Sequence, residues 1–206
     1  SRSYRFANVD EIYETTPAFT NQFQFLRPQT ALSHEVGIEA RRAHAGGRAT
    51  AFLIDVTDEI HLDPFTTGVG NRNLPPSRRR GIELEGNARP FAVFGSRALP
   101  QFNLAATYTY VEATFREGVL PGSVFTQANV NLAGKSVPLV SRHKASLRAS
   151  WDLTSATRLN ALISHVSAQF MDNDEPNNLG ARIPAYTLLD VKLTHRNAPW
   201  LFAPTV

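Results

Sequence analysis

Several residues of this sequence could in principle bind a metal or act in catalysis, but none completes a motif. His34 and Glu35 begin like the zinc motif H-E-x-x-H, yet Ile38 stands where the second histidine is needed. The run GVGNRN, residues 68–73, has Asn73 in place of the third glycine of a dinucleotide-binding loop. The chain has no cysteine and no G-x-S-x-G motif. We therefore expect no enzyme, no cofactor and no metal. Serine and histidine residues are both present but nothing places them together, so a hydrolase is kept only as an alternative hypothesis.

The span 134–151, GKSVPLVSRHKASLRASW, is dense in basic side chains and resembles a nucleic-acid patch at first sight. Its basic residues Arg142, Lys144 and Arg148 all fall on even positions. The odd positions are apolar: Leu139, Ala145, Leu147, Ala149 and Trp151. Strict alternation is typical of a strand with two different faces. Because the net charge is only +3 and the other arginines are scattered, we expect no nucleic-acid partner.

Two further polar runs have a possible role in binding. Arg79 lies in SRRRG, residues 77–81, which could meet phosphates or an anionic ligand, or form a solvated strand end. In DNDEPNN, Asp172, Asp174 and Glu175 offer oxygen ligands of the kind that calcium prefers. No EF-hand pattern follows these carboxylates, so we favour an ordinary polar loop.

The elements that must position these residues are strands. Two-residue alternation recurs along the chain and helical periodicity is scarce, which predicts an all-β fold. The segments are roughly 10 to 15 residues long, more than the 5–6 residues of an average globular strand. The seven segments are 31–42, 48–60, 77–87, 101–115, 134–151, 157–170 and 185–195.

The connections between these segments alternate in length. The links 43–47 and 152–157 are short and 89–100 is intermediate, whereas 61–76, 117–136 and 171–182 are long and polar. Bacterial outer-membrane barrels have short turns at one end and long loops at the other, whereas a soluble sandwich has no reason to. Aromatic residues near the expected strand ends agree with interfacial girdles: Tyr108, Tyr110, Trp151, Phe170 and Tyr186. We predict an antiparallel transmembrane β-barrel segment of about seven long strands.

Six stretches together resemble the C-terminal half of a TonB-dependent outer-membrane receptor. They are YRFANVDEIY (4–13), FLRPQTALSHEVGIEA (25–40), AFLIDVTDEI (51–60), NRNLPPSRRRGIELE (71–85), AGKSVPLVSRHKASL (133–147) and DNDEPNNLGARIPAYTLLDVKLTH (172–195). The resemblance implies a barrel of about 22 strands, filled by an N-terminal plug, in the outer membrane of a Gram-negative bacterium. It also implies import of a ferric siderophore, haem or cobalamin-type ligand with energy from the TonB complex, and contact with outer-membrane lipid and lipopolysaccharide.

The chain departs from that family pattern, since it contains neither plug nor TonB box and only about seven strands. We expect part of a longer receptor, with a partial barrel domain at 1–196 and an atypical tail at 197–206. A small independent β-barrel or a soluble β-sandwich with a binding or structural role is the alternative.

In a barrel of this family, the polar face of the strand at 134–151 would line the lumen. We therefore take Arg79, Arg142, Lys144 and Arg148 as candidate ligand-binding residues for an anionic metal chelate. The competing interpretation is that the basic side chains pair with lumenal carboxylates on neighbouring strands, such as Glu83 and Glu85, or on the plug. His143 falls on the lipid-facing side, which suggests a position near the membrane interface.

Overall fold

The computed structural model describes residues 1–13, 23, 25–63, 70–93, 102–121, 128–197 and 200–202. Two short helices lie among strands of very different length. The elements in chain order are β1 (Arg2–Arg5), α1 (Val9–Ile12), β2 (Gln29–Arg41), β3 (Ala45–Thr57), β4 (Ile60–Asp63), β5 (Gly70–Asn73), β6 (Ser77–Ala88), α2 (Pro90–Val93), β7 (Phe102–Phe115), β8 (Val119–Leu120), β9 (Val130–Asn131), β10 (His143–Asp152), β11 (Thr157–Val166), β12 (Gln169–Phe170), β13 (Arg182–Ile183), β14 (Tyr186–Asn197) and β15 (Trp200–Phe202).

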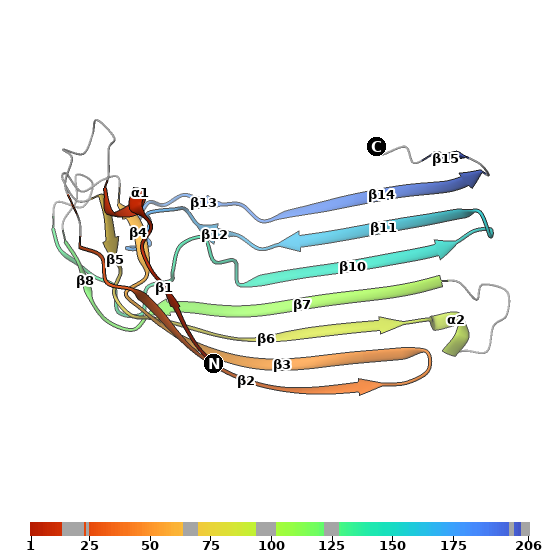
Figure 1. Cartoon of the computed structure of the whole chain (residues 1–206), viewed down its shortest axis with the longest axis horizontal. Helices are drawn as coiled ribbons and strands as arrows, with labels where there is room; N and C mark the ends of the chain where they lie inside the picture. Colours follow the sequence, from red (N-terminus) through yellow and green to blue (C-terminus); the bar gives the residue numbers. More distant parts are fainter. Residues whose placement is uncertain are drawn as a thin grey trace.

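The long strands form one antiparallel sheet in which neighbours in space follow one another in sequence. Its order is β1-β2-β3-β6-β7-β10-β11-β14-β15, and β1 and β15 are the edges of this open arc. Seven of these strands, β2, β3, β6, β7, β10, β11 and β14, contain 10 to 14 residues each. The prediction of seven long antiparallel strands is confirmed (Figure 1).

The two faces of this sheet differ in composition, as alternation predicts. The register places Leu147 of β10 opposite Ala106 of β7 and Ile163 of β11, and Ile163 opposite Leu189 of β14. Large apolar side chains on this side are exposed, including Val36 at 72% and Ile38 at 74%. We call this side the outward face and the opposite side the polar face. Exposed apolar side chains on one face of a long sheet are what a lipid-facing wall requires.

The two ends of the sheet carry different connections (Figure 1). At the turn end, residues 42–44 link β2 to β3 and residues 153–156 link β10 to β11. At the loop end, longer segments fold into three two-stranded sheets, β4-β5, β8-β9 and β12-β13. The predicted short turns after β2 and β10 and the predicted long loops are confirmed, whereas the link from β6 to β7 is of intermediate length and contains α2. Within the described ranges, no helix has the length and apolar character needed to cross a membrane.

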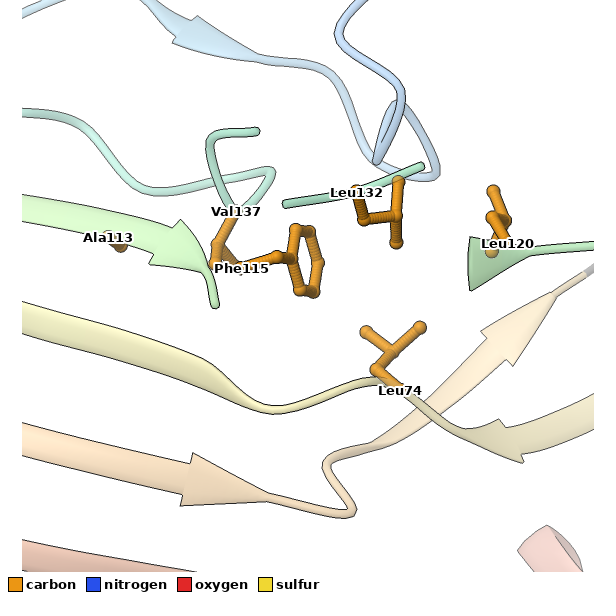
Figure 2. Close-up of a cluster of buried hydrophobic side chains, with 6 residues drawn as sticks. All are labelled: Leu74, Ala113, Phe115, Leu120, Leu132 and Val137. Atoms are coloured by element: carbon orange, nitrogen blue, oxygen red, sulfur yellow. The ribbon is translucent and has the colours of Figure 1, made fainter. Parts of the chain in front are cut away.

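The hydrophobic core lies at the loop end, not along the sheet. Figure 2 shows its members gathered where β7 ends and the 128–141 segment returns. Phe115 is 1% exposed and Leu132 is fully buried. Backbone hydrogen bonds stabilise the same region: Phe115 N donates to Lys135 O at 2.9 Å, and Gly134 N donates to Phe115 O at 2.9 Å. The buried cluster comprises Leu74, Ala113, Phe115, Leu120, Leu132 and Val137.

Two details differ from the sequence prediction, and a third concerns the expected tail. Leu139 is not on the outward face of a strand, because β10 begins only at His143 and Leu139 adopts a left-handed φ of 58° in the preceding loop. Tyr186 pairs with Val166 on the polar face, so it is not part of an outward aromatic girdle, and Phe170 lies in the β12-β13 hairpin. Residues 200–202 of the expected tail form β15, which pairs with β14, while 198–199 and 203–206 lie outside the described residues.

Candidate functional site

The polar face carries the basic row that the sequence singles out. Lys144 lies opposite Thr109 of β7, and Thr109 in turn lies opposite Glu83 of β6. Basic and acidic side chains thus share the face but are separated by the whole of β7, about 10 Å between strand axes. The register therefore puts no carboxylate of the Glu83 and Glu85 face directly beside the row, while pairing with a carboxylate outside this chain stays a prediction. Among the described residues, Arg142, Lys144 and Arg148 make no ion pair.

Arg79 differs from the other candidates because its charge is already compensated. Its Nη2 atom lies 2.7 Å from Glu59 Oε1 and 2.8 Å from Oε2. The flanking arginines are paired as well, Arg78 with Asp55 and Arg80 with Glu112. The SRRRG run therefore connects β6 to neighbouring strands and to the loop end.

Arg142, itself exposed, lines a partly open pocket at the loop end. The residue precedes β10, and its carbonyl accepts a hydrogen bond of 3.0 Å from Val111 N of β7, which keeps it in line with the polar face. The pocket has a volume of about 150 Å³. A second guanidinium, that of Arg182, lies over the Phe170 ring with Cζ 4.2 Å from its centroid. The lining residues are Ala113, Ser136, Val140, Arg142, Ala168, Gln169, Phe170 and Arg182.

Arg148 lies in a different place from Arg142. Six residues further along the strand, it is about 20 Å closer to the turn end. There it lines a hollow of about 320 Å³ whose rim includes Arg42, His44 and Arg89. The basic row is therefore divided between the two ends of the sheet.

A tight turn at 174–179 organises the loop beside the Arg142 pocket. Asp174 is 1% exposed, and its Oδ1 accepts hydrogen bonds from Asn178 N at 2.8 Å and Leu179 N at 3.3 Å. Asn177 then joins this turn to the segment before β10, because its Oδ1 accepts from Ser136 N at 2.6 Å and its Nδ2 donates to Ser136 O at 3.0 Å. The DNDEPNN run is thus a structural turn. Within the described part of the chain, no group of three or more His, Asp or Glu could hold a metal ion.

His61 of β4 ties a second loop to the same turn. Its Nε2 lies 2.9 Å from Asn173 Oδ1 and 3.0 Å from Oε1 of Glu175, which is 3% exposed. Burial of the ring lowers its pKa, but hydrogen bonds and charge attraction, mainly from Glu175, outweigh it and raise the pKa of His61 above 6.5.

This ion pair predicts a pH-dependent loop end. Because the folded-state pKa of His61 is raised, the pair stabilises fully below pH 6.5 and is lost as pH rises through the folded-state pKa. We expect backbone amides of 60–63 and 171–179 to be about fivefold better protected from hydrogen exchange at pH 6 than at pH 8, after correction for intrinsic rates. Glu175→Gln should remove the difference. Equal protection at both pH values in the unsubstituted protein would contradict the assignment.

The outward face has aromatic groups at two levels. Near the turn end, Phe102 and Trp151 make an edge-to-face contact with ring centroids 6.3 Å apart. Near the loop end, His143 Nδ1 lies 2.8 Å from the hydroxyl of Tyr108, and Tyr110 packs beside the same imidazole. Aromatic levels on either side of an apolar band mark the two interfaces of a membrane-spanning wall. The interfacial position expected for His143 agrees with this contact.

The fold and its two faces together define a segment of a membrane-spanning β-barrel wall with a polar lumen. Comparison with known families is more specific, because the model of the TonB-dependent receptor-like β-barrel matches residues 1–199. The chain belongs to the TonB-dependent receptor β-barrel family, whose members are outer-membrane proteins of Gram-negative bacteria. The polar face is therefore the lumenal face.

Solved structures support the same fold. The chain is similar to the ferric citrate transporter FecA in its unliganded form, with 20% identity, a TM-score of 0.63 and 84% of this chain covered. It is also similar to the ferric yersiniabactin uptake receptor FyuA from Yersinia pestis, with 17% identity, a TM-score of 0.65 and 95% covered. For the copper transporter OprC the identity is 13%, the TM-score 0.63 and the coverage 96%. The chain spans about a quarter of their lengths: 24%, 26% and 28% respectively. No curated protein matches the sequence.

Sequence reasoning missed half of the loop-end pocket. Arg182, Phe170, Gln169 and Ser136 come from three segments that only the folded loop brings together. The closely spaced Arg142 and Lys144 gave a local signal, whereas Arg182 is a lone arginine in a loop. A pairing of Phe170 with Arg182 is visible only once the β12-β13 register is known.

Proposed function

We propose that the protein containing this chain is an outer-membrane receptor that imports a scarce nutrient, with a ferric siderophore or similar iron chelate as its ligand. Membership of the TonB-dependent receptor family supports the transport role and the TonB complex as energy source. The apolar outward face would contact outer-membrane lipid, with lipopolysaccharide at the loop end. The observation that carries the ligand class is the lumenal pocket at the loop end, where Arg142 and Arg182 have no carboxylate among the described residues.

Several considerations favour an iron chelate over a free metal ion. Copper and other transition metals are bound through imidazole, thiolate or thioether donors, whereas this pocket presents guanidinium groups. Guanidinium groups repel cations and attract anionic oxygen ligands. Of the similar structures, FecA and FyuA are named for ferric chelates and OprC for copper, which makes a copper chelate the informative comparison ligand.

The four candidate residues have different parts in this proposal. Arg142 and Lys144 lie at the outer end of the lumen, where an entering ligand arrives first. Arg79 forms an ion pair with Glu59 and has a structural role in the barrel wall. Arg148 lies deeper, toward the turn end, where it lines a separate hollow.

Uptake of radiolabelled iron tests the proposal. The full-length gene is expressed in a Gram-negative host lacking its own siderophore receptors, with and without TonB. We expect TonB-dependent accumulation of ⁵⁵Fe from at least one anionic ferric chelate in a panel of carboxylate, catecholate and hydroxamate complexes. A copper chelate serves as the comparison ligand. Folded protein in the outer membrane that imports none of the ferric chelates would refute the function.

A further inference from the structure

We propose that the Arg142–Arg182 pocket is a carboxylate subsite, which selects ferric chelates bearing a free carboxylate arm. This inference rests on the proposed function and deepens it, because it names the chemical group of the ligand and the residues that receive it. Five observations support it: position, charge, size, preorganisation and the distance from the other basic residues.

The position of the pocket suits an incoming ligand. Ala113 and Arg142 both belong to the polar face, since Arg142 is bonded to Val111 and Ala113 lies two residues further along β7. β7 ends at Phe115, so the pocket lies just inside the loop end of the wall. A ligand arriving at the outer mouth of the lumen meets this pocket before it meets the turn end.

The charged side chains of the pocket are all basic. Its polar side chains are two arginines, a glutamine and a serine, and no acidic residue lines it within the described residues. The hollow around Arg41 and Arg48 differs, since Glu39 and Glu85 line the same space and Glu39 is paired with both arginines. The guanidinium charges at Arg142 and Arg182 are therefore uncompensated by neighbours and available to an anion.

The size and chemistry of the pocket fit one carboxylate arm. About 150 Å³ is too small for a whole ferric chelate, which must lie mainly in the lumen. A planar carboxylate accepts two parallel N–H bonds from a guanidinium, and Lys cannot reproduce that geometry. Gln169 and Ser136 add neutral hydrogen-bonding groups beside the two charges. Phe170 holds the Arg182 guanidinium from one side by a cation–π contact.

The backbone around the pocket is fixed before any ligand arrives. Ser141 Oγ lies 3.0 Å from Ser167 Oγ, and His143 N donates to Ser167 Oγ at 3.0 Å, which joins the start of β10 to the end of β11. Asn177 holds Ser136 through both its amide atoms. Leu139 N donates to the carbonyl of Phe170 at 3.1 Å. A backbone fixed in this way limits the entropy that the segments around the pocket lose on binding.

The chain also offers a matched control. Arg148 lies on β10, on the same face as Arg142, which directly precedes that strand; it is equally unpaired among the described residues and lies about 20 Å deeper. Arg148→Gln therefore removes the same charge from the lumen without altering the pocket. Long-range attraction would be weakened similarly by either change, whereas direct contact would be lost only at Arg142.

The test measures equilibrium binding of ferric citrate and of an uncharged ferric trihydroxamate to the full-length protein in detergent, alongside the uptake panel. For ferric citrate we expect Arg142→Gln and Arg182→Gln each to raise the Kd about tenfold or more, and Arg148→Gln to change it less than twofold. The trihydroxamate should bind poorly to all of these proteins. Equal amounts of folded protein in the outer membrane verify that the variants are intact.

The outcomes separate the two proposals. Import of a catecholate or hydroxamate chelate together with failure to bind any carboxylate chelate would overturn the subsite and leave the receptor function standing. Binding of ferric citrate that Arg142→Gln and Arg182→Gln leave unchanged, or that Arg148→Gln weakens equally, would also overturn the subsite. A folded protein that neither binds nor imports any of the chelates would overturn both the subsite and the receptor function.

Discussion

Replacement of Gly81 by alanine is expected to lower strongly the amount of protein that reaches the folded state. Gly81 lies on the polar face of β6, opposite Phe52 of β3 and Val111 of β7. A Cβ atom there would lie 2.0 Å from the carbonyl oxygen of Tyr110 and 2.7 Å from Cζ of Phe52. The phenyl ring can rotate, but the carbonyl belongs to the sheet backbone and cannot retreat without breaking the β6-β7 pairing. We expect Gly81→Ala to cost about 3 kcal/mol or more.

The measurement is the amount of folded full-length protein in the outer-membrane fraction, followed by its midpoint of unfolding in urea. Gly86→Ala is the matched control, because it lies five residues away in the same strand and its Cβ would meet nothing closer than Gly46 O at 3.9 Å. That variant should be as stable as the unsubstituted protein, or slightly more so, since alanine restricts the unfolded chain. Equal folding of the two variants would show that the backbone around Gly81 can make room for a Cβ atom.

The wall of the barrel was predictable from the sequence because its determinant is local. A strand between lipid and a polar lumen must alternate apolar with polar side chains. This two-residue pattern is visible in the sequence of all seven long strands: β2, β3, β6, β7, β10, β11 and β14. Errors occurred where alternation continues by coincidence. Leu139 keeps the odd-numbered pattern of the strand after it, but its positive φ puts it in the loop. Tyr186 has the aromatic character of a girdle residue, but its parity puts it on the polar face.

The loop end was not predictable in the same way, because its contacts join distant segments. His61 and Glu175 are 114 positions apart, and Ser136 and Asn177 are 41 apart. No periodic pattern in the sequence predicts such contacts. The strands of the two-stranded sheets β4-β5, β8-β9 and β12-β13 are too short for an alternating pattern to be recognised. Helix α1 is an exception, since Asn8 and Glu11 form a capping box that the sequence displays as N-x-x-E. The candidate pocket shows the same difference: Arg142 was found through the alternation that continues into β10, and Arg182 was found only through the fold.

Truncation of Phe115 is expected to loosen the loop end while the strands stay paired. The ring is 1% exposed and packs with Leu74, Leu132 and Val137 in the only extended apolar cluster of the described residues (Figure 2). Phe115→Ala leaves the backbone bonds to Gly134 and Lys135 chemically possible but removes the side chain that they surround. A cavity of this size costs about 3 to 5 kcal/mol. Hydrogen exchange of 128–141 in the full-length protein measures the loss as faster local opening.

Phe25→Ala is the control for this change, because Phe25 is 85% exposed and its truncation should alter stability by less than about 0.5 kcal/mol. Amides in the middle of β10 and β11 should exchange as slowly in Phe115→Ala as in the unsubstituted protein. Ala113 belongs both to this core and to the Arg142 pocket, so Phe115→Ala should also weaken ferric citrate binding without changing any charge. If exchange at 128–141 is unaffected, the cluster does not hold the loop end in place. If exchange is faster but binding is unchanged, the pocket does not depend on this core and must be fixed by the Asn177 and Ser167 contacts alone.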